Sequence, residues 1–310
     1  MFLIRIHFNY AIFFKKNYIN NKYLIFFPKY NRNYYIYEKT LSYIMFKSMS
    51  GLEQQLYFRL GEKDQRVFTI KDIKKILNVS FAHARNIASD MVKKNAAERV
   101  KSGLFVRIPE SVILDKQQYN EDAILIAAKS TNKAFLSHYT ALTIHGLAER
   151  YTTQIYITTT KHQRNIKYHK IKFNYIKIIP KKFFGYKTIT YSNEHIQISD
   201  LERTLIDVIN KPKYTGGWNE TLNCLKNIDE INNKQLIAYI KKYNNKTIAR
   251  KTGYILEKLN NLNPSQKIIE EIKEISGSND LYFNTSKKGI YDKKWNLIIP
   301  ENIIEAINAN

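Results

Sequence analysis

The sequence predicts an α+β fold in two parts: an N-terminal module of three helices and a hairpin, then an α+β domain with a small, mostly antiparallel sheet and C-terminal helices. Apolar residues recur three and four positions apart before residue 95 and again after residue 217, which is the period of a helix. Between residues 152 and 199, short segments rich in Ile, Thr and Tyr alternate with polar turns, as is typical of strands. At 310 residues and 44% hydrophobic content, the chain is long enough for two domains.

The chain is strongly basic. It contains 50 Lys and Arg against 27 Asp and Glu, which gives a formal net charge of +23. Such an excess favours an anionic partner, either nucleic acid or a membrane surface. The single cysteine, Cys224, excludes an internal disulfide and a zinc site of clustered thiolates, and it fits a reducing cytoplasm. We interpret Cys224 as a small apolar side chain in a core.

Residues 1–50 differ from the rest of the chain, because they are crowded with Phe, Tyr, Ile and Asn and are interrupted repeatedly by Lys and Arg. No apolar run approaches the roughly 20 residues that a membrane-spanning helix needs, and no small-residue cleavage site follows one. The sequence therefore predicts no membrane anchor, no signal peptide and a cytoplasmic location. Our hypothesis is that this atypical extension belongs to an over-long reading frame, with initiation at Met45 or Met49.

Residues 51–112 predict the first folded unit. Leucines four residues apart line one face of a first helix, at Leu52, Leu56 and Leu60. Thr69, with Asp72 three residues later, predicts a capping box that begins a second helix ending at Asn78. Ser80 then caps a third helix with a broad apolar arc, which comprises Phe81, Ala84, Ile87, Ala88, Met91 and Val92.

The opposite side of the third helix is small and polar near its start. Two helices joined by a turn as short as NVS predict a helix-turn-helix, in which Ala82 permits close approach and Asn86 suits the edge of adenine. The following segment ERVKSGLFVRIPE predicts a basic hairpin, or wing, that turns at Gly103 and ends at Pro109. We expect its basic side chains to be exposed and to meet phosphate oxygens.

The sequence thus predicts a winged helix-turn-helix that binds double-stranded DNA. A merely solvated basic face is the simpler alternative, but the complete order of helices, short turn and hairpin favours DNA binding. His83 has no second ligand at a helical spacing, so we expect no metal site. The residues expected to contact DNA are Ser80, Ala82, His83, Arg85, Asn86, Lys93, Lys94, Arg99, Lys101 and Arg107.

Residues 118–310 predict the second domain, and its sharpest pattern is SDLERTLIDVINKP. Ser199 and Glu202 predict a capping box, and Arg203 lies one turn before Asp207, at the spacing of an intrahelical ion pair. Asp200, Glu202 and Asp207 could instead be the metal ligands of a nuclease, which stays open as an alternative.

The residues of this domain suggest two other functions. Its Tyr-rich strands could stack the bases of a single-stranded RNA in an adaptor protein, which remains a second alternative. A hydrolase is not favoured, because Ser137 lacks a glycine-flanked nucleophile elbow and is better explained as a helix cap. Gly-rich phosphate loops are absent as well, and we expect no cofactor.

Five segments in consistent order resemble the AbiEi antitoxin family of type IV toxin-antitoxin systems: SGLFVRIP, FLSHYTALTIHGL, ISDLERTLIDVI with KPKYTGG, RKTGYILEKL and KKWNLIIP. The resemblance spans roughly residues 51–300. It implies a winged-helix repressor without enzymatic activity. The winged helix would bind inverted repeats in its own promoter, and the second domain would oppose a nucleotidyltransferase-like toxin without degrading it. The helix in SDLERTLID would lie in the core of the antitoxin domain, and we expect a monomer or a weak dimer.

Overall fold

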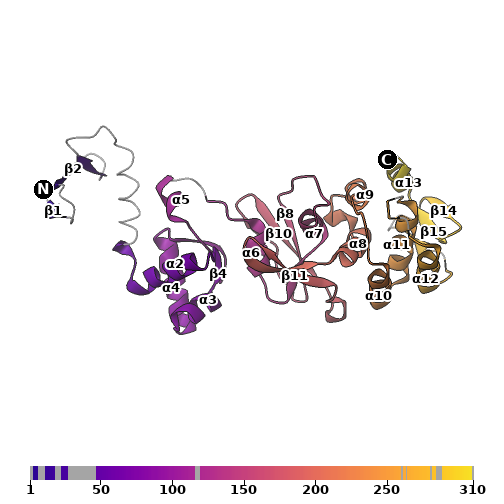
Figure 1. Ribbon diagram of the computed structural model, residues 1–310, viewed down its shortest axis with the longest axis horizontal. Helices are drawn as coiled ribbons and strands as arrows, with labels where there is room; N and C mark the ends of the chain where they lie inside the picture. The colour runs from indigo at the N-terminus through magenta and orange to yellow at the C-terminus, as the bar shows by residue number, and fades with distance from the viewer. Residues whose placement is uncertain are drawn as a thin grey trace.

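The computed structural model describes residues 3–5, 11–17, 22–26, 47–115, 119–259, 261–262, 264–279, 281–283 and 288–308. The fold is α+β, as the sequence predicts. Its parts follow one another along the long axis of the molecule in chain order, with the largest sheet between the N-terminal helices and the C-terminal helices (Figure 1). Among the described residues, no helix combines the length and the apolar composition that crossing a bilayer requires.

The N-terminal segment contains three short antiparallel strands, in the order β1 (Leu3–Arg5), β2 (Ala11–Asn17) and β3 (Lys22–Phe26). Of the two starts considered above, Met45 lies outside the described residues. Met49 is buried in the hydrophobic core of the unit that follows.

The first folded unit contains three helices and three strands, in the chain order α2 (Gly51–Glu62), β4 (Val67–Thr69), α3 (Ile70–Leu77), α4 (Phe81–Lys93), β5 (Ala97–Lys101) and β6 (Leu104–Arg107). The two predicted caps are confirmed, since Thr69 and Asp72 form a capping box and Ser80 Oγ accepts from the His83 amide at 3.2 Å. Asn78 ends α3 in the left-handed conformation that Asn tolerates, with φ of 53°.

The strands of this unit form an antiparallel sheet in the order β4-β6-β5, and both faces of that sheet are covered. The rings of Phe68 and Phe105 stack with their centres 5.7 Å apart and pack with the helices, against the buried side of α4. Val67, Leu104 and Val106 face the opposite way, into a second core that includes α6 (Ala123–Lys129). The short helix α5 (Glu110–Asp115) follows β6.

The largest sheet has six strands: β7 (Ala134–Leu136), β8 (Gln154–Thr159), β9 (Ile166–Tyr168), β10 (Ile171–Lys177), β11 (Tyr186–Tyr191) and β12 (Glu194–Ser199). Their order is β11-β12-β7-β8-β10-β9, with parallel pairs β12–β7 and β10–β8 and three antiparallel pairs. The expectation of a small sheet is therefore wrong. Ala134–Leu136, for which the sequence predicted no strand, joins the two halves of the sheet, and three residues are too few to show a strand period.

Helices cover both faces of this sheet. The core on one face contains residues of α6, and the core on the other contains α7 (His138–Ile144) and α8 (Leu201–Asn210). The short 3-10 helix η1 (Pro180–Lys182) precedes β11, and η2 (Pro212–Tyr214) follows α8. The C-terminal elements are α9 (Trp218–Lys226), α10 (Asn233–Tyr243), α11 (Lys246–Lys258), α12 (Gln266–Ser276), β13 (Leu281–Tyr282), β14 (Ile290–Asp292), β15 (Leu297–Ile299) and α13 (Glu301–Asn308).

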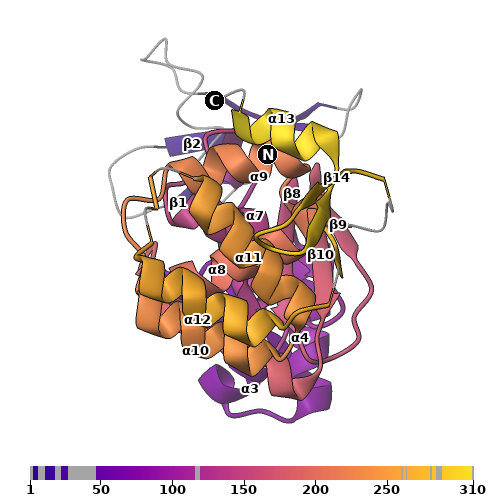
Figure 2. The ribbon, with the colours of Figure 1, turned by 90° about the vertical axis from the view of Figure 1, so that its right-hand side faces the viewer.

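One tryptophan packs directly against α11 among the C-terminal helices. Seen from the end of the molecule, α10, α11 and α12 lie together (Figure 2). Trp295 is buried between β14 and β15, donates from its indole nitrogen to Glu257 Oε2 at 2.6 Å, and lies against Gly253 of α11. A Cβ atom at Gly253 would meet the ring at 2.1 Å, so the tryptophan can approach the helix only where a side chain is absent.

We expect Gly253→Ala to lower the free energy of unfolding by about 1–3 kcal/mol through overpacking. The loss is expected although alanine normally makes a helix interior about 1 kcal/mol more stable than glycine does. The matched control is Gly51→Ala at the start of α2, where a Cβ meets nothing within 4 Å. Urea denaturation measures both variants, and equal stability of the two would contradict the packing argument.

Candidate nucleic-acid interface

The side of α4 that faces away from the core is open to solvent. Four residues of the predicted apolar arc are buried, namely Ala84, Ile87, Ala88 and Met91, and Val92 is half-buried. Phe81, which was expected in the same arc, is exposed at the start of the helix. The small and polar residues expected on the other side are exposed, namely Ser80, Ala82, His83, Arg85 and Asn86. The structure therefore places five of the ten predicted contact residues together on one accessible face.

A basic groove of about 590 Å³ begins beside this face and ends in the sheet domain. Arg85 of α4 and Arg99 of β5 line it, as do Lys71 of α3 and Lys161 from the turn after β8. No Asp or Glu is among the lining residues that the structure describes, and none of the described carboxylates pairs with these four cations. The groove can therefore attract the phosphate groups of a nucleic acid.

The hairpin β5–β6 lies against the sheet domain instead of projecting into solvent. Lys101 Nζ donates to Gln163 Oε1 at 3.1 Å and lies 5.2 Å from the centre of the Tyr175 ring. Gln163 donates in turn to Thr131. Burial lowers the pKa of the Lys101 ammonium. The expected exposure of Lys101 is wrong, because a bulge between Arg99 and Lys101 breaks the alternation on which it depended.

Three other predicted contacts are engaged within the protein. Lys93 pairs with Asp90 at 2.9 Å on the surface of α4, and Lys94 pairs with the buried Glu53 at 2.7 Å. The Arg107 guanidinium lies 5.1 Å from the centre of the Tyr57 ring and against α2, so it is half-buried rather than exposed as expected. Glu53 is distant from Lys94 in sequence, and local patterns could not reveal that pair.

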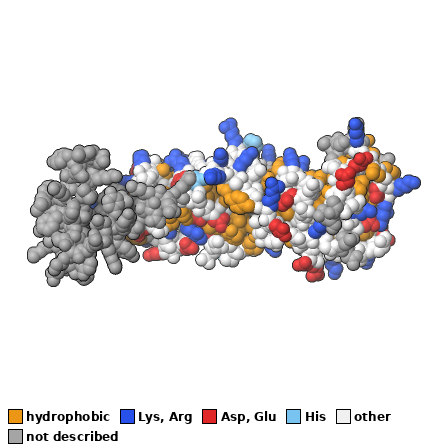
Figure 3. Space-filling view, turned by 90° about the horizontal axis from the view of Figure 1, so that it is seen from above, with side chains coloured by type: hydrophobic (Ala, Val, Ile, Leu, Met, Phe, Trp, Pro, Cys, Tyr) orange, Lys and Arg blue, Asp and Glu red, His pale blue; other side chains and the backbone are white. Residues whose placement is uncertain are grey.

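Sequence reasoning missed Lys71, Lys129 and Lys161 as residues of the groove. Lys129 pairs with Glu194 at 2.6 Å and donates to the Val67 carbonyl at 3.1 Å, so it joins the sheet of the first unit to the sheet domain. Only the basic turn KHQRN pointed to Lys161. Along the face in Figure 3, basic side chains alternate with acidic ones rather than forming one continuous patch.

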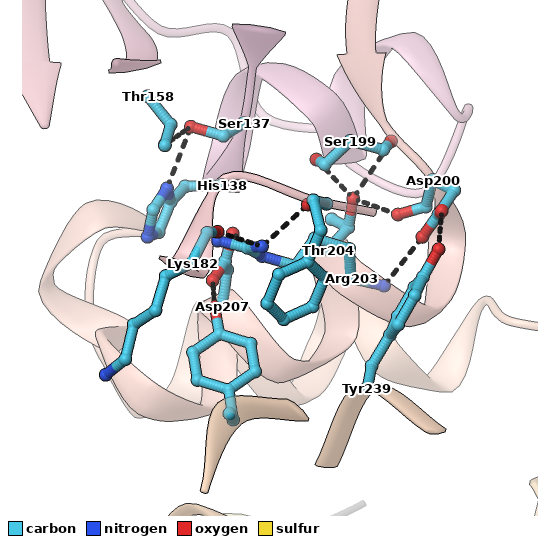
Figure 4. A network of polar contacts seen from close by, with 12 residues as sticks. Ser137, His138, Thr158, Lys182, Ser199, Asp200, Arg203, Thr204, Asp207 and Tyr239 are labelled. Carbon is cyan, nitrogen blue, oxygen red and sulfur yellow. Dashed lines mark hydrogen bonds and ion pairs between the residues drawn. The ribbon is translucent and has the colours of Figure 1, made fainter. Parts of the chain in front are cut away.

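The three carboxylates of the nuclease alternative accept hydrogen bonds from protein groups, and Figure 4 shows two of them, Asp200 and Asp207. Asp200 caps α8 and accepts from Gln235 Nε2 and the Tyr239 hydroxyl. Asp207 accepts from Arg203 Nε at 2.9 Å and from the Tyr243 hydroxyl, and Glu202 accepts from the Asn232 amide. Among the described residues, no three His, Cys, Asp or Glu side chains are grouped to hold a metal ion.

The predicted capping box of Ser199 and Glu202 is wrong. Ser199 ends β12, and its hydroxyl bonds to Thr204 Oγ1 at 2.7 Å, so the cap moves one residue on to Asp200. The predicted ion pair of Arg203 with Asp207 is confirmed, and both side chains are buried.

Ser137 and His138 lie in contact but deep inside the molecule. Ser137 stands at the N-cap of α7, yet its hydroxyl bonds to Thr158 Oγ1 at 2.7 Å and to His138 Nδ1 at 3.0 Å instead of capping the helix (Figure 4). Their exposed fractions are 0% and 3%, so neither side chain faces solvent. Cys224 is also buried, as predicted, and burial raises the pKa of its thiol to about 12.

No protein-family model and no curated protein matches this chain. Among solved structures, the chain is similar to the crystal structure of the RV2827C protein from Mycobacterium tuberculosis, with a TM-score of 0.57 and 10% sequence identity. The match covers 84% of this chain and 95% of the other. At this identity the likeness concerns the fold alone.

Burial lowers the pKa of His138 to about 4, below the value near 6.5 expected in an unfolded chain. Between these values the unfolded state binds more protons, so His138 should reduce stability by about 3 kcal/mol as the pH falls from 6.5 to 4. We expect His138→Asn, whose side chain tolerates the positive φ of 52°, to flatten this slope in urea denaturation. The exposed His83→Asn is the control and should keep the slope. Parallel pH profiles for both variants would contradict the assignment.

Proposed function

We propose that the protein binds double-stranded DNA through a winged helix-turn-helix within residues 51–112, with α4 as the recognition helix. The observation that carries the proposal is the exposed polar face of α4, which opens directly onto a basic groove without carboxylates. The order of α2, β4, α3, α4 and the β5–β6 hairpin supports it, because a helix held by a short turn can enter a major groove.

Contacts on this interface divide into two kinds. Asn86 offers an amide that can pair with adenine, and the small Ala82 lets the backbone of α4 come near the bases. Arg85, Arg99, Lys71 and Lys161 supply phosphate contacts, which give affinity without base preference. In this arrangement Arg99 is the contribution of the hairpin, while Lys101 and Arg107 hold the hairpin in place.

Substitutions should separate these two kinds of contact. We expect Arg85→Ala and Arg99→Ala to weaken binding to all duplexes and to reduce the slope of log K against log salt by about one unit each. Asn86→Ala should reduce discrimination between sequences by about 1–3 kcal/mol. Fluorescence anisotropy with a duplex from upstream of the gene measures both effects.

The controls lie outside the groove. Lys181→Ala removes an exposed positive charge on η1 and should leave the slope of log K against log salt unchanged. Arg107→Ala should lower the free energy of unfolding and leave that slope unchanged. Salt-independent binding, or none to upstream DNA, would contradict the proposal. Preference for single-stranded RNA would favour the adaptor, and Mg²⁺-dependent cleavage lost in Asp207→Ala would favour the nuclease.

We further propose that the protein is a repressor and antitoxin of a type IV system, without enzymatic activity of its own. This part rests on the resemblance of five segments to the AbiEi family. The segment SDLERTLID supports it in one respect, since α8 is almost wholly buried at the centre of the largest hydrophobic core.

The antitoxin role predicts a nucleotidyltransferase-like gene beside this one. Expression of that gene alone should arrest growth, and co-expression of this protein should restore it. The double substitution of Asn86 and Arg99 by alanine should still restore growth, because neutralisation is assigned to the second domain. Growth arrest that persists with the wild-type protein present would refute the role.

A further inference from the structure

A cavity of about 500 Å³ lies between the N-terminus of α6, the exposed side of α7, the start of β8 and the turn that joins β9 to β10. It is separate in its lining from the basic groove, with which it shares no residue. Its volume is in the range of sites that enclose a small organic molecule.

The wall of this cavity is mainly apolar, with hydroxyl groups set into it. Apolar contacts come from Ile124, Ile155 and Ile171 and from the ring of Tyr168. Thr140 and Thr143 line it from successive turns of α7. Thr140 Oγ1 accepts from the backbone amide of Tyr156 at 2.8 Å, and the Thr143 hydroxyl donates to the Tyr139 carbonyl at 3.0 Å. Such a lining suits a ligand whose body is aromatic or aliphatic.

The charges around the cavity favour an anionic group on that ligand. The two acids in the lining already have partners. Glu121 pairs with Arg66 at 3.5 Å and accepts from the Tyr119 hydroxyl at 2.6 Å, and Asp122 accepts from the backbone amide of Ile124 at the start of α6 and from the Tyr191 hydroxyl, both at 2.8 Å. Arg150 and Lys170 are exposed in the lining, and no described carboxylate pairs with either. Their positive charge is therefore available to a bound anion.

The same cavity touches the contacts that hold β5 to the sheet domain. Glu98 of β5 accepts from the Tyr168 hydroxyl at 2.7 Å and from His169 Nε2 at 2.6 Å. His169 Nδ1 lies 2.7 Å from Asn120 Oδ1. Tyr168, His169 and Asn120 all line the cavity, so a ligand there would contact the side chains that position the hairpin.

We propose that this cavity binds a small apolar molecule carrying one anionic group, such as an aromatic carboxylate, and that its occupancy changes the affinity of the first unit for DNA. The second clause rests on the proposed function, whereas the binding site does not. A ligand that contacts Tyr168 and His169 changes the hydrogen bonds that these two residues make to Glu98. Because Glu98 and Arg99 are neighbours in β5, the position of Arg99 beside α4 changes as well.

Anilinonaphthalene sulfonate has the required chemistry and fluoresces on entering an apolar site. Titrated against the full chain, it should bind saturably at one site and be displaced by naphthoate but not by inorganic phosphate. We expect Thr143→Phe to weaken binding of the probe about tenfold or more, because the larger side chain fills the cavity and a packed site does not easily accept added bulk. Arg150→Gln should weaken it about threefold, the scale of an exposed ion pair.

The matched controls are Thr188→Phe, on the exposed side of β11, and Lys181→Gln, and both should leave the titration unchanged. Equal binding by all four variants, or displacement by inorganic phosphate, would overturn the site. Coupling is measured separately, as DNA affinity of the wild type and of Thr143→Phe with and without saturating probe. A bound probe that leaves DNA affinity unchanged would overturn the coupling alone, and a chain that binds no DNA would overturn the proposed function while the titration still decides the site.

Discussion

The alternation of side chains along β4 and β6 is the constraint on which the rest of the molecule depends. Phe68 and Phe105 point to the helices of the first unit, while Val67, Leu104 and Val106 point to α6 and the six-stranded sheet. A slip of one residue would exchange these faces and remove apolar side chains from both cores. Because one short sheet serves two cores, the orientation of α4 and the position of the sheet domain are set together.

This shared sheet also decides which charges are available on the surface. A free hairpin would expose every basic residue on its outer side, but here its edge strand lies against the sheet domain and is held at Glu98 and Lys101. Two lysines of the groove, Lys101 and Lys129, form contacts within the protein. The same packing brings Lys161, from a turn of the sheet domain, to the groove that Arg85 and Arg99 line. The interface is thus a product of tertiary packing and not of the helix alone.

The sequence was sufficient where a feature depends on neighbours along the chain. The capping box at Thr69, the cap at Ser80, the end of α3 at Asn78 and the buried arc of α4 all arise within one or two helical turns. Features that depend on distant residues were missed. Periodicity does not report the insertion of Ala134–Leu136 between two strands, the parallel pairs that result, or the pair of Lys94 with Glu53. The cap of α8 was missed by one residue because β12 runs directly into it, so the hydroxyl of Ser199 is turned toward Thr204. Half of the predicted DNA contacts lie on the open face of α4, and the other half depend on how the hairpin and the end of α4 pack.

The buried ion pair of Arg203 and Asp207 in α8 has a similar role in the second domain, because it fixes the positions of the elements around it. Arg203 is 1% exposed, and its guanidinium binds Asp207 together with the carbonyls of Lys182 and Phe184. Replacing such a pair by apolar residues often costs no stability, so its net contribution to folding is small or even unfavourable. Its geometry is demanding, however, because all the donors must find acceptors once they leave water. Arg203 therefore fixes the loop before β11 against α8, and Asp207, through the hydroxyl of Tyr243, fixes α10 against the same helix. The sheet and the C-terminal helices are held in one arrangement by directional bonds, where apolar packing alone would permit several.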